Sequence, residues 1–184
     1  QAPEAATIGW MVASGNHNQQ TIADAAAGLE MQQKRALGVE KLPEIKRADG
    51  RQAFLDTLGT SFTKMRQAET SLVETAHAIA DARAQRLGWK EVSSDEYKKI
   101  LLEVMGQTSD NNFTYGGLQT YNGFKTVVPP GIKNTSSWKP FENGSLADVM
   151  GAINHADMID DFGKMPMSGN GTPLSLDKIR RMVL

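Results

Sequence analysis

The sequence predicts a mainly α-helical protein: a helical bundle or hairpin core with a long central helix, then a loop-rich C-terminal half bearing one small β-hairpin. Three observations support this. Apolar residues recur at helical spacing between residues 51 and 87. After Gly106 the composition changes, and Gly, Asn, Ser and Thr become frequent. Asn122-Gly123 then separates two short runs typical of strands.

The first fifty residues are expected to hold one or two elements. The patch IGWMV, within residues 1–20, fits an opening helix or a strand, and an amide-rich turn containing His17 follows it. A weakly amphipathic helix is expected over residues 21–37, ending before Gly38 or Pro43. Residues 38–50 are expected to form a linker. The helical spacing that predicts the inward face of the 21–37 helix runs through Ile22, Ala26, Leu29, Gln33 and Ala36.

The strongest periodic signal predicts one helix from about Arg51 to Leu87, stopped by Gly88. At roughly 1.5 Å per residue, this helix would be on the order of 55 Å long, whereas a chain of this size has a radius of gyration of about 16 Å. Either the helix breaks near Gly59 or Glu69, or it projects and pairs with a partner helix. The 21–37 helix is the expected partner, in an antiparallel hairpin. The stripe itself runs through Leu55, Leu58, Phe62, Met65, Leu72, Ala76 and Ile79, widened by Val73, Ala80 and Leu87.

The helix expected between Ser93 and Gly106 has a clear N-terminal signal. Ser93 and Glu96 form a capping box, which predicts a helix that Gly106 ends. Beyond it, a hairpin is expected from Gln119–Tyr121 and Phe124–Val128, terminated by Pro129-Pro130-Gly131. A hairpin alone is only marginally stable in water, so it should lean on the helical body.

The remaining residues predict two more helices in the C-terminal half. Ser145 is positioned to cap one that ends by Gly163, and Ser175 to cap a short final one. The expected organisation is a helical domain over 1–106 and a loop-rich subdomain over 107–184, joined in one continuous domain.

Composition excludes several classes of protein. The chain of 184 residues contains no cysteine, which rules out disulfides, cysteine-ligated zinc and thiol catalysis. Its formal net charge is -1, and no basic stripe of the kind that binds nucleic acid is present. No apolar run reaches the length of a membrane-spanning helix.

The first residues suggest export. The chain begins Gln-Ala-Pro-Glu-Ala-Ala, a small-residue start that resembles the product of signal-peptide removal, although a truncated chain would look the same. Together with the missing cysteines this favours a periplasmic, extracellular or virion location. The cytoplasm stays open.

One segment gathers chemically reactive residues. His155, Asp157 and Asp161 lie close together in sequence and are weak candidates for a divalent cation site. Their spacing fits neither an EF-hand loop nor a His-Glu-x-x-His zinc site, so a solvated helix face is the expected outcome. Met165 and Met167, with His155 nearby in sequence, allow a copper site because thioethers select Cu(I), although flexible core filling explains the methionines more simply. We expect no bound metal and no cofactor.

Catalytic signals are weak. No Gly-x-Ser-x-Gly elbow, Walker loop or dinucleotide-binding motif is present. Glu103 and Asp110 could form a carboxylate pair like that of a glycosidase, but any protein with 21 acidic residues offers such pairs. Whether the chain is an enzyme stays open, with the balance against it.

The expected function is that of a non-enzymatic exported structural or interaction protein, such as a subunit or adaptor of an envelope assembly, an appendage or a virion. Its partner would be another protein or a second copy of the chain, and carbohydrate stays open as a partner. A secreted enzyme acting on cell-wall or other glycans and a periplasmic small-ligand or metal-binding protein are the alternatives. Rigid aromatic side chains beside Asn and Gly favour recognition. The expected partner-binding residues are Tyr115, Tyr121, Phe124 and Trp138.

Overall fold

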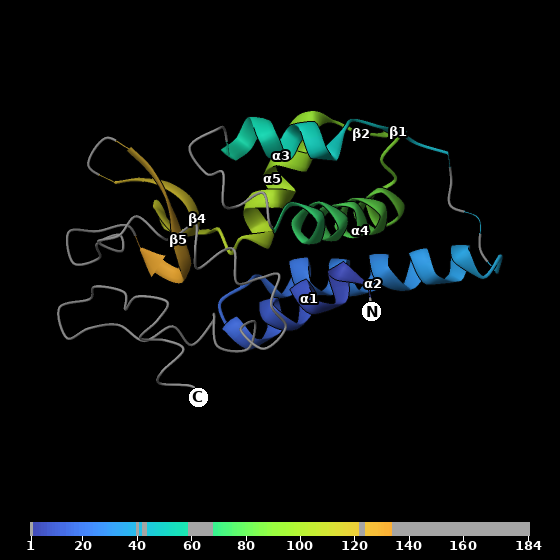
Figure 1. Cartoon of the computed structure of the whole chain (residues 1–184), viewed down its shortest axis with the longest axis horizontal. Coiled ribbons are helices and arrows are strands. Elements are labelled where there is room, and N and C mark those ends of the chain that lie inside the picture. The colour runs from blue at the N-terminus through green and yellow to red at the C-terminus, as the bar shows by residue number, and fades with distance from the viewer. Residues whose placement is uncertain (1, 40, 42–43, 59–67, 122–123, 134–184) are drawn as a thin grey trace.

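The protein is a helical body with a small antiparallel sheet at one end (Figure 1). The computed structural model describes residues 2–39, 41, 44–58, 68–121 and 124–133. Within these residues there are five helices, a parallel pair of two-residue strands and a three-stranded antiparallel sheet. The predicted fold class is therefore confirmed. The helices predicted after Ser145 and Ser175 lie outside the described residues.

The N-terminal patch forms a helix, α1 (Pro3–Ser14), which begins with a proline in its first turn and ends at Gly15 in the left-handed conformation. The next helix, α2 (Gln19–Ala36), matches the predicted range of 21–37 to within two residues. The Asn18 side chain caps α2 by accepting hydrogen bonds from the backbone N–H groups of Gln20 and Thr21, at 2.8 and 3.3 Å. Both helix starts therefore have local causes in the sequence.

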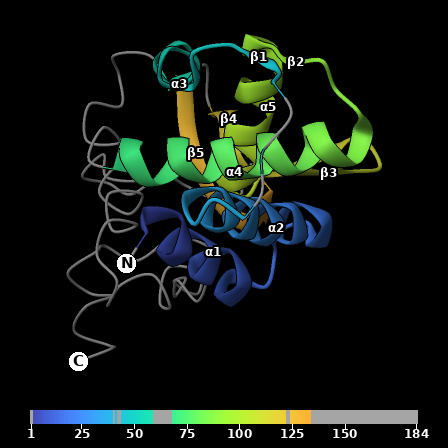
Figure 2. The same ribbon diagram turned by 90° about the vertical axis from the view of Figure 1, so that its right-hand side faces the viewer.

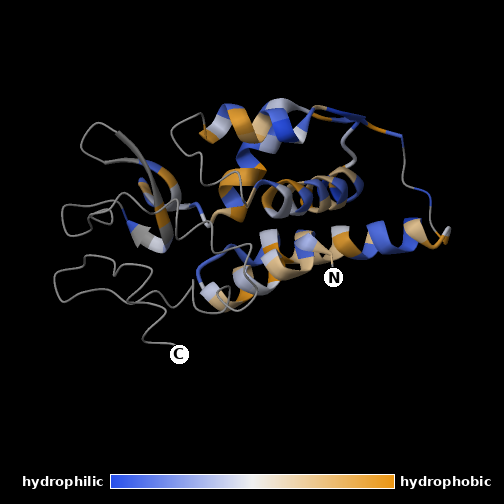
Figure 3. Ribbon diagram, in the orientation of Figure 1, coloured by the Kyte–Doolittle hydropathy of each residue, from blue (hydrophilic) through white to orange (hydrophobic). Residues whose placement is uncertain are grey.

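The face that α2 turns to the core differs from the predicted one. Ala26, Gln33 and Ala36 are exposed, and Ile22 and Leu29 are only half-buried. The buried positions of α2 are instead Thr21, Asp24, Ala25, Gly28 and Met31. Apolar spacing failed here because the neighbouring helix supplies arginines for Asp24 and approaches closely enough to require a glycine. Figure 3 shows that the outer part of α2 carries many hydrophilic residues.

The single helix predicted from Arg51 to Leu87 is wrong, and the alternative, a break near Gly59 or Glu69, is confirmed. The structure has two helices, α3 (Gly50–Leu58) and α4 (Glu69–Leu87). Arg51 Nε lies 2.7 Å from Glu69 Oε1, whereas residues 18 apart in one straight helix would be about 27 Å apart. α3 therefore does not continue straight into α4 but lies beside it (Figure 1). Neither helix is too long for a compact chain of this size, so no projecting helix is needed.

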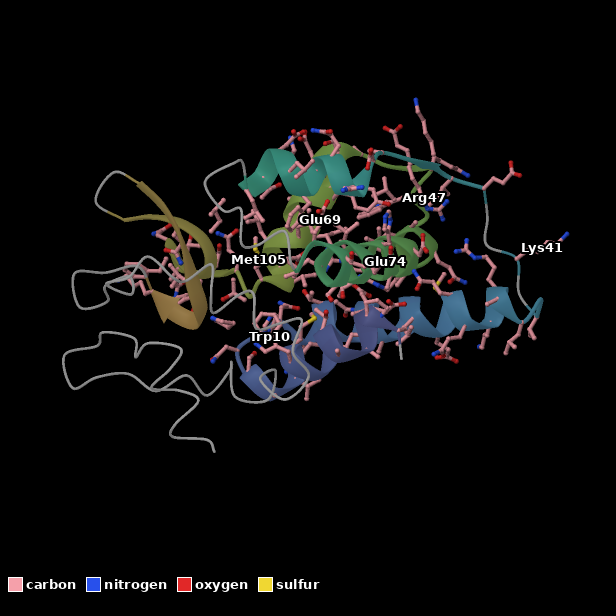
Figure 4. All side chains as sticks on the ribbon, in the orientation of Figure 1. Trp10, Lys41, Arg47, Glu69, Glu74 and Met105 are labelled. Atoms are coloured by element: carbon pink, nitrogen blue, oxygen red, sulfur yellow. The ribbon has the colours of Figure 1, made fainter. Side chains whose placement is uncertain are left out.

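The centre of the core is α4, which contacts α1, α2, α3 and α5. Leu72 and Ile79 are fully buried, as the stripe predicts, whereas Leu87 at the end of the helix is exposed. Because α4 is covered on several sides, buried positions occur nearly all around it. In Figure 4, Glu74 lies along this helix and Trp10 lies on α1 below it.

The pairing of α2 with α4 is confirmed, but not as a hairpin of consecutive helices. α3 lies between them in sequence, and Figures 1 and 2 together show the two helices crossing. At the crossing Gly28 meets Ala78, where a Cβ atom on Gly28 would lie 1.8 Å from the Ala78 carbonyl oxygen. Only glycine permits this approach.

The final helix, α5 (Ser94–Val104), begins as predicted. The Ser93 hydroxyl accepts a hydrogen bond from the Glu96 N–H at 3.1 Å. Its inward side chains pack into the same core as α4, and the chain turns at Gly106, whose φ is 94°. The buried residues of α5 are Tyr97, Ile100, Leu101 and Val104.

Two sheets complete the fold. β1 (Lys46–Arg47) pairs in parallel with β2 (Glu91–Val92) beside the end of α4. β3 (Thr108–Asp110), β4 (Phe113–Tyr121) and β5 (Phe124–Lys133) form the antiparallel sheet, here named the hairpin sheet. The predicted hairpin is confirmed, but β3 was not predicted, and β5 continues past Pro129-Pro130-Gly131. Among the described helices, none combines the length and apolarity that crossing a membrane requires.

Candidate functional site

The hairpin sheet is built from two tight turns. Asp110 pairs with Phe113, so Asn111 and Asn112 alone connect β3 to β4, and both have positive φ, 45° and 73°. Two consecutive positive values are what a type I′ turn requires, and asparagine tolerates them better than most residues. At the other end Tyr121 pairs with Phe124 across the two residues 122–123. β3 was not predicted, although Asn111-Asn112 was a usable turn signal.

Close backbone contacts attach the sheet to the helices. The register shifts between Tyr115 and Gly117, and the Pro129–Gly131 stretch of β5 accommodates the extra length. Gly116 and Gly117 both have positive φ, and a Cβ atom on Gly116 would lie 2.4 Å from the carbonyl oxygen of Gly106. The prolines therefore do not end the strand, because this irregular ladder needs no regular N–H donor there.

Side chains add to this attachment. Asn16 Nδ2 donates to the Pro130 carbonyl at 3.4 Å, and Gln107 Nε2 donates to the Leu118 carbonyl at 3.1 Å. Val128 is fully buried and belongs to the same apolar core as the helices. The sheet is thus held to the body by both strands of its hairpin, which limits how far it can move relative to the helices.

The hairpin sheet presents Phe113, which is 46% exposed, next to the Lys133 ammonium at 3.4 Å from its ring centroid. Of the predicted partner-binding residues, Tyr115 is half-buried and its Cα pairs with that of Lys133. Tyr121 and Phe124 are brought together as a backbone pair, and their side chains are not described. Trp138 lies outside the described residues, as do His155, Asp157 and Asp161.

His17 lies between α1 and α2, in the expected amide-rich turn, and its side chain is buried. Its Nδ1 lies 2.6 Å from Ser14 Oγ and its Nε2 lies 2.9 Å from the Val104 carbonyl oxygen. Since a carbonyl only accepts, the neutral ring carries its proton on Nε2, and Nδ1 accepts from Ser14. Burial lowers the pKa of His17, and the bond to Val104 partly opposes this. The ring also packs edge-on against Trp10. His17 therefore joins the α1–α2 turn to the end of α5.

A network of charges joins three helices. Asp24 of α2 accepts hydrogen bonds from Arg83 Nε at 3.0 Å and Arg86 Nη2 at 2.9 Å, and Arg83 Nη1 donates to Glu103 of α5 at 2.6 Å. Burial alone would raise the pKa of Asp24, but the bonds from Arg86, Arg83 and Gln20 lower it. Glu103, considered above as half of a catalytic pair, is engaged by Arg83, which leaves that pair without support.

A polar groove lies between the starts of α3 and α4. It encloses about 320 Å³ and is lined by Asp49, Arg51, Glu69, Thr70, Val73, Glu74 and His77. His77 Nδ1 lies 3.0 Å from the Tyr97 hydroxyl. Burial, followed by the nearby charge of Asp81, raises the pKa of Tyr97 to about 12, so this hydroxyl stays protonated and donates to His77.

Two of the carboxylates of this groove, Glu69 and Asp49, already have structural roles. Glu69 pairs with Arg51, and Asp49 accepts the N–H groups of Arg51 and Gln52 at the start of α3, at 3.0 and 3.2 Å. Figure 4 places Glu69 and Glu74 along α4. In the part of the chain that is described, no three side chains of the metal-ligating types come close enough together to hold a metal ion.

A second pocket, here named the junction pocket, lies where the end of α4 meets β1 and α2. It encloses about 200 Å³. No site was predicted here, because the lining residues come from distant segments of the sequence. The Gly88-Trp89 pair was visible only as a helix stop followed by an aromatic residue. The lining residues include Met31, Arg47, Asp81, Ala84, Trp89 and Lys90.

Comparison of the chain with models of known protein families, with curated proteins and with solved structures finds no match. The functional proposals below therefore depend on the residues and their geometry alone.

Proposed function

We propose that this chain is a non-enzymatic interaction protein, which binds another protein or a second copy of itself through the hairpin sheet. The observation that supports this most is the exposed Phe113 beside Lys133, on a sheet attached to the body through buried contacts. A rigid aromatic ring next to a cation gains contact area on binding at little entropic cost. The backbone register adds Tyr121 and Phe124 at the far end of the same hairpin.

The way the sheet is attached favours recognition over a purely structural role. The side that faces the helices is occupied by Val128, Gly116 and Gly117, whereas Phe113 and Asp110 are exposed. Asn111 and Asn112 at the turn are exposed as well, which gives donors and acceptors around the aromatic ring. Such a mixture suits a moderately polar protein interface. An exported subunit or adaptor of an envelope assembly, appendage or virion is the class of protein we propose.

The test compares two matched substitutions of exposed apolar residues. Phe113→Ala alters the hairpin sheet, and Leu37→Ala alters the tip of α2, where Leu37 is 78% exposed. Figure 1 places this end of α2 at the other end of the molecule from the sheet. Light scattering over a range of concentrations measures self-association, and cross-linking in the native source followed by affinity capture measures binding of another protein.

We expect the complex formed by the wild type to persist with Leu37→Ala and to weaken with Phe113→Ala, Tyr121→Ala and Trp138→Ala. Circular dichroism should remain helical for all four variants. A complex that survives all three aromatic substitutions would exclude the hairpin sheet from the interface. A chain that stays monomeric and captures nothing in the cross-linking experiment would refute the proposed function.

A further inference from the structure

The junction pocket is formed by three segments that are far apart in sequence. The last turns of α4 supply Asp81 and Ala84, β1 supplies Arg47, and α2 supplies Met31. Figure 1 shows β1, β2 and the end of α4 away from the hairpin sheet. A ligand at the junction pocket would therefore not need the surface proposed above for protein binding.

The walls of the pocket are held by backbone hydrogen bonds. Gly88 ends α4 in the left-handed conformation, with φ of 69°, and the Trp89 N–H donates to the Ala84 carbonyl at 3.0 Å. This helix end fixes the backbone of Trp89 next to Ala84. β1 is held in turn by the Lys46 N–H, which donates to the Lys90 carbonyl at 3.2 Å. The pocket is thus formed before any ligand arrives.

Asp81 is the unusual member of this pocket. Its side chain is 6% exposed, and its Oδ1 atom accepts both bonds from Arg47, from Nε at 3.2 Å and from Nη2 at 2.9 Å. Its other oxygen, Oδ2, accepts no hydrogen bond from the described residues. Because Asp81 Oδ2 is not one of the fully buried atoms, it can accept a hydrogen bond from water or from a ligand that reaches the pocket. Figure 4 shows Arg47 between the β1–β2 pair and α4.

The rest of the lining has an apolar wall and a polar rim. Met31 and Ala84 are buried, and Ile45 and Trp89 are half-buried. The rim consists of the exposed residues Glu44, Gln85 and Lys90. The volume of about 200 Å³ is of the same order as a cavity of about 150 Å³ that binds benzene, so the pocket suits a small ligand. An indole face also attracts an ammonium group that lies within about 6 Å of it. The pocket therefore combines an open carboxylate oxygen with a small apolar wall.

We propose that the junction pocket binds a small primary ammonium ion carried on an apolar body, of about the size of an amino acid. The ammonium group donates to Asp81 Oδ2, and the apolar body packs against Trp89 and Met31. Lys90, which also lines the pocket, provides a cation for the carboxylate of a free amino acid. A simple amine and a zwitterionic amino acid share the first two contacts and differ in the third.

The test uses the intact chain and three probes with one common body: phenethylammonium, L-phenylalanine and neutral N-acetylphenethylamine. Binding is followed by the NMR shift of the Trp89 indole N–H, assigned by its loss in Trp89→Phe. We expect phenethylammonium to shift this signal and to bind at least tenfold more tightly than the neutral probe, because a hydrogen bond to a charged group contributes that much. Tighter binding of L-phenylalanine than of phenethylammonium would identify the natural ligand class as amino acids, and weaker binding would identify it as amines.

Two matched substitutions locate the contact. Asp81→Asn should weaken phenethylammonium binding at least tenfold and leave the neutral probe unchanged. Asp24→Asn alters another buried carboxylate that pairs with arginines, outside the pocket, and should change binding less than twofold. Equal binding of the charged and neutral probes to the wild type would overturn the proposal without any variant. So would the absence of any shift at millimolar concentrations, which would mean that water alone occupies the pocket.

Discussion

The closest approach between helices in this protein, at Gly28 of α2 and Ala78 of α4, gives a sharp test of the fold. In Gly28→Ala the added Cβ atom would lie 1.8 Å from the Ala78 carbonyl oxygen, and the two helices must separate until this distance exceeds 3.0 Å. The obstructing atoms all belong to the Ala78 backbone, so no side-chain rotation can relieve the contact. The strain must therefore be taken up by the packing of α2 on α4.

The expected magnitude follows from two opposing effects. Overpacking a core costs about 1–3 kcal/mol and occasionally more, and a rigid backbone obstacle places this substitution at or above the upper end. A separation of about 1 Å also loses roughly half of the dispersion energy of the contacts around it. Replacing a helical glycine by alanine returns about 1 kcal/mol. We expect a net loss of about 2–3 kcal/mol, or a drop of about 4–12 °C in Tm.

The assay is urea unfolding followed by circular dichroism, with Gly9→Ala as the matched control. Gly9 also lies within a helix, is exposed, and has nothing within 4 Å of its added Cβ atom. The control should therefore gain up to about 1 kcal/mol from helix propensity alone. The two substitutions are chemically identical and should have opposite signs. A Gly28→Ala variant as stable as Gly9→Ala would refute the close crossing of α2 and α4.

Two further predictions concern the core and its pH dependence. Leu72→Ala and Ile79→Ala should each lower the free energy of unfolding by about 2–5 kcal/mol in the same assay, because both side chains are fully buried. The control Leu87→Ala alters an exposed residue and should cost less than about 0.5 kcal/mol. Equal losses for all three variants would show that α4 is not the centre of the core. Burial lowers the pKa of His17 below its ordinary value of 6.5. As the pH falls through that value, His17 binds a proton in the unfolded chain but stays neutral in the folded chain. The free energy of unfolding therefore decreases as the pH falls. A His17→Gln variant should have a flatter dependence of Tm between about pH 7 and pH 5, and an unchanged slope would contradict the burial of the neutral ring.

Several local features could be predicted because their causes lie within a few residues of one another. The helix that begins after Ser93 needs only a hydroxyl acceptor and a following apolar stripe, and both are adjacent in sequence. The hairpin around residues 122–123 needs a turn dipeptide between two short runs, and the Tyr121–Phe124 pair confirms it. Gly88 likewise ends α4 where the sequence predicts.

Longer elements were predicted less well, because their extent depends on contacts distant in sequence. The apolar spacing continues from α3 into α4, so periodicity alone left open whether the helix breaks near Gly59 or Glu69 or projects. Only the contact between Arg51 and Glu69 decides between these outcomes. Similarly, Pro129-Pro130-Gly131 is a strong local stop, but Val128 and Pro130 pack against the helical body and the strand continues through an irregular ladder. In both cases burial outweighed a local preference.

The amino-acid sequence by itself determined the helical class, most helix ends and the position of the hairpin, because capping, turn geometry and apolar period are properties of neighbouring residues. Only the tertiary structure decided which face of α2 is buried, that His17 is a core residue, and that Asp81 opens into a pocket. The physical reason is that burial of a side chain is the sum of what all surrounding elements cover. The pocket at Asp81 exists only where α2, α4 and β1 meet, and no stretch of the sequence contains all three.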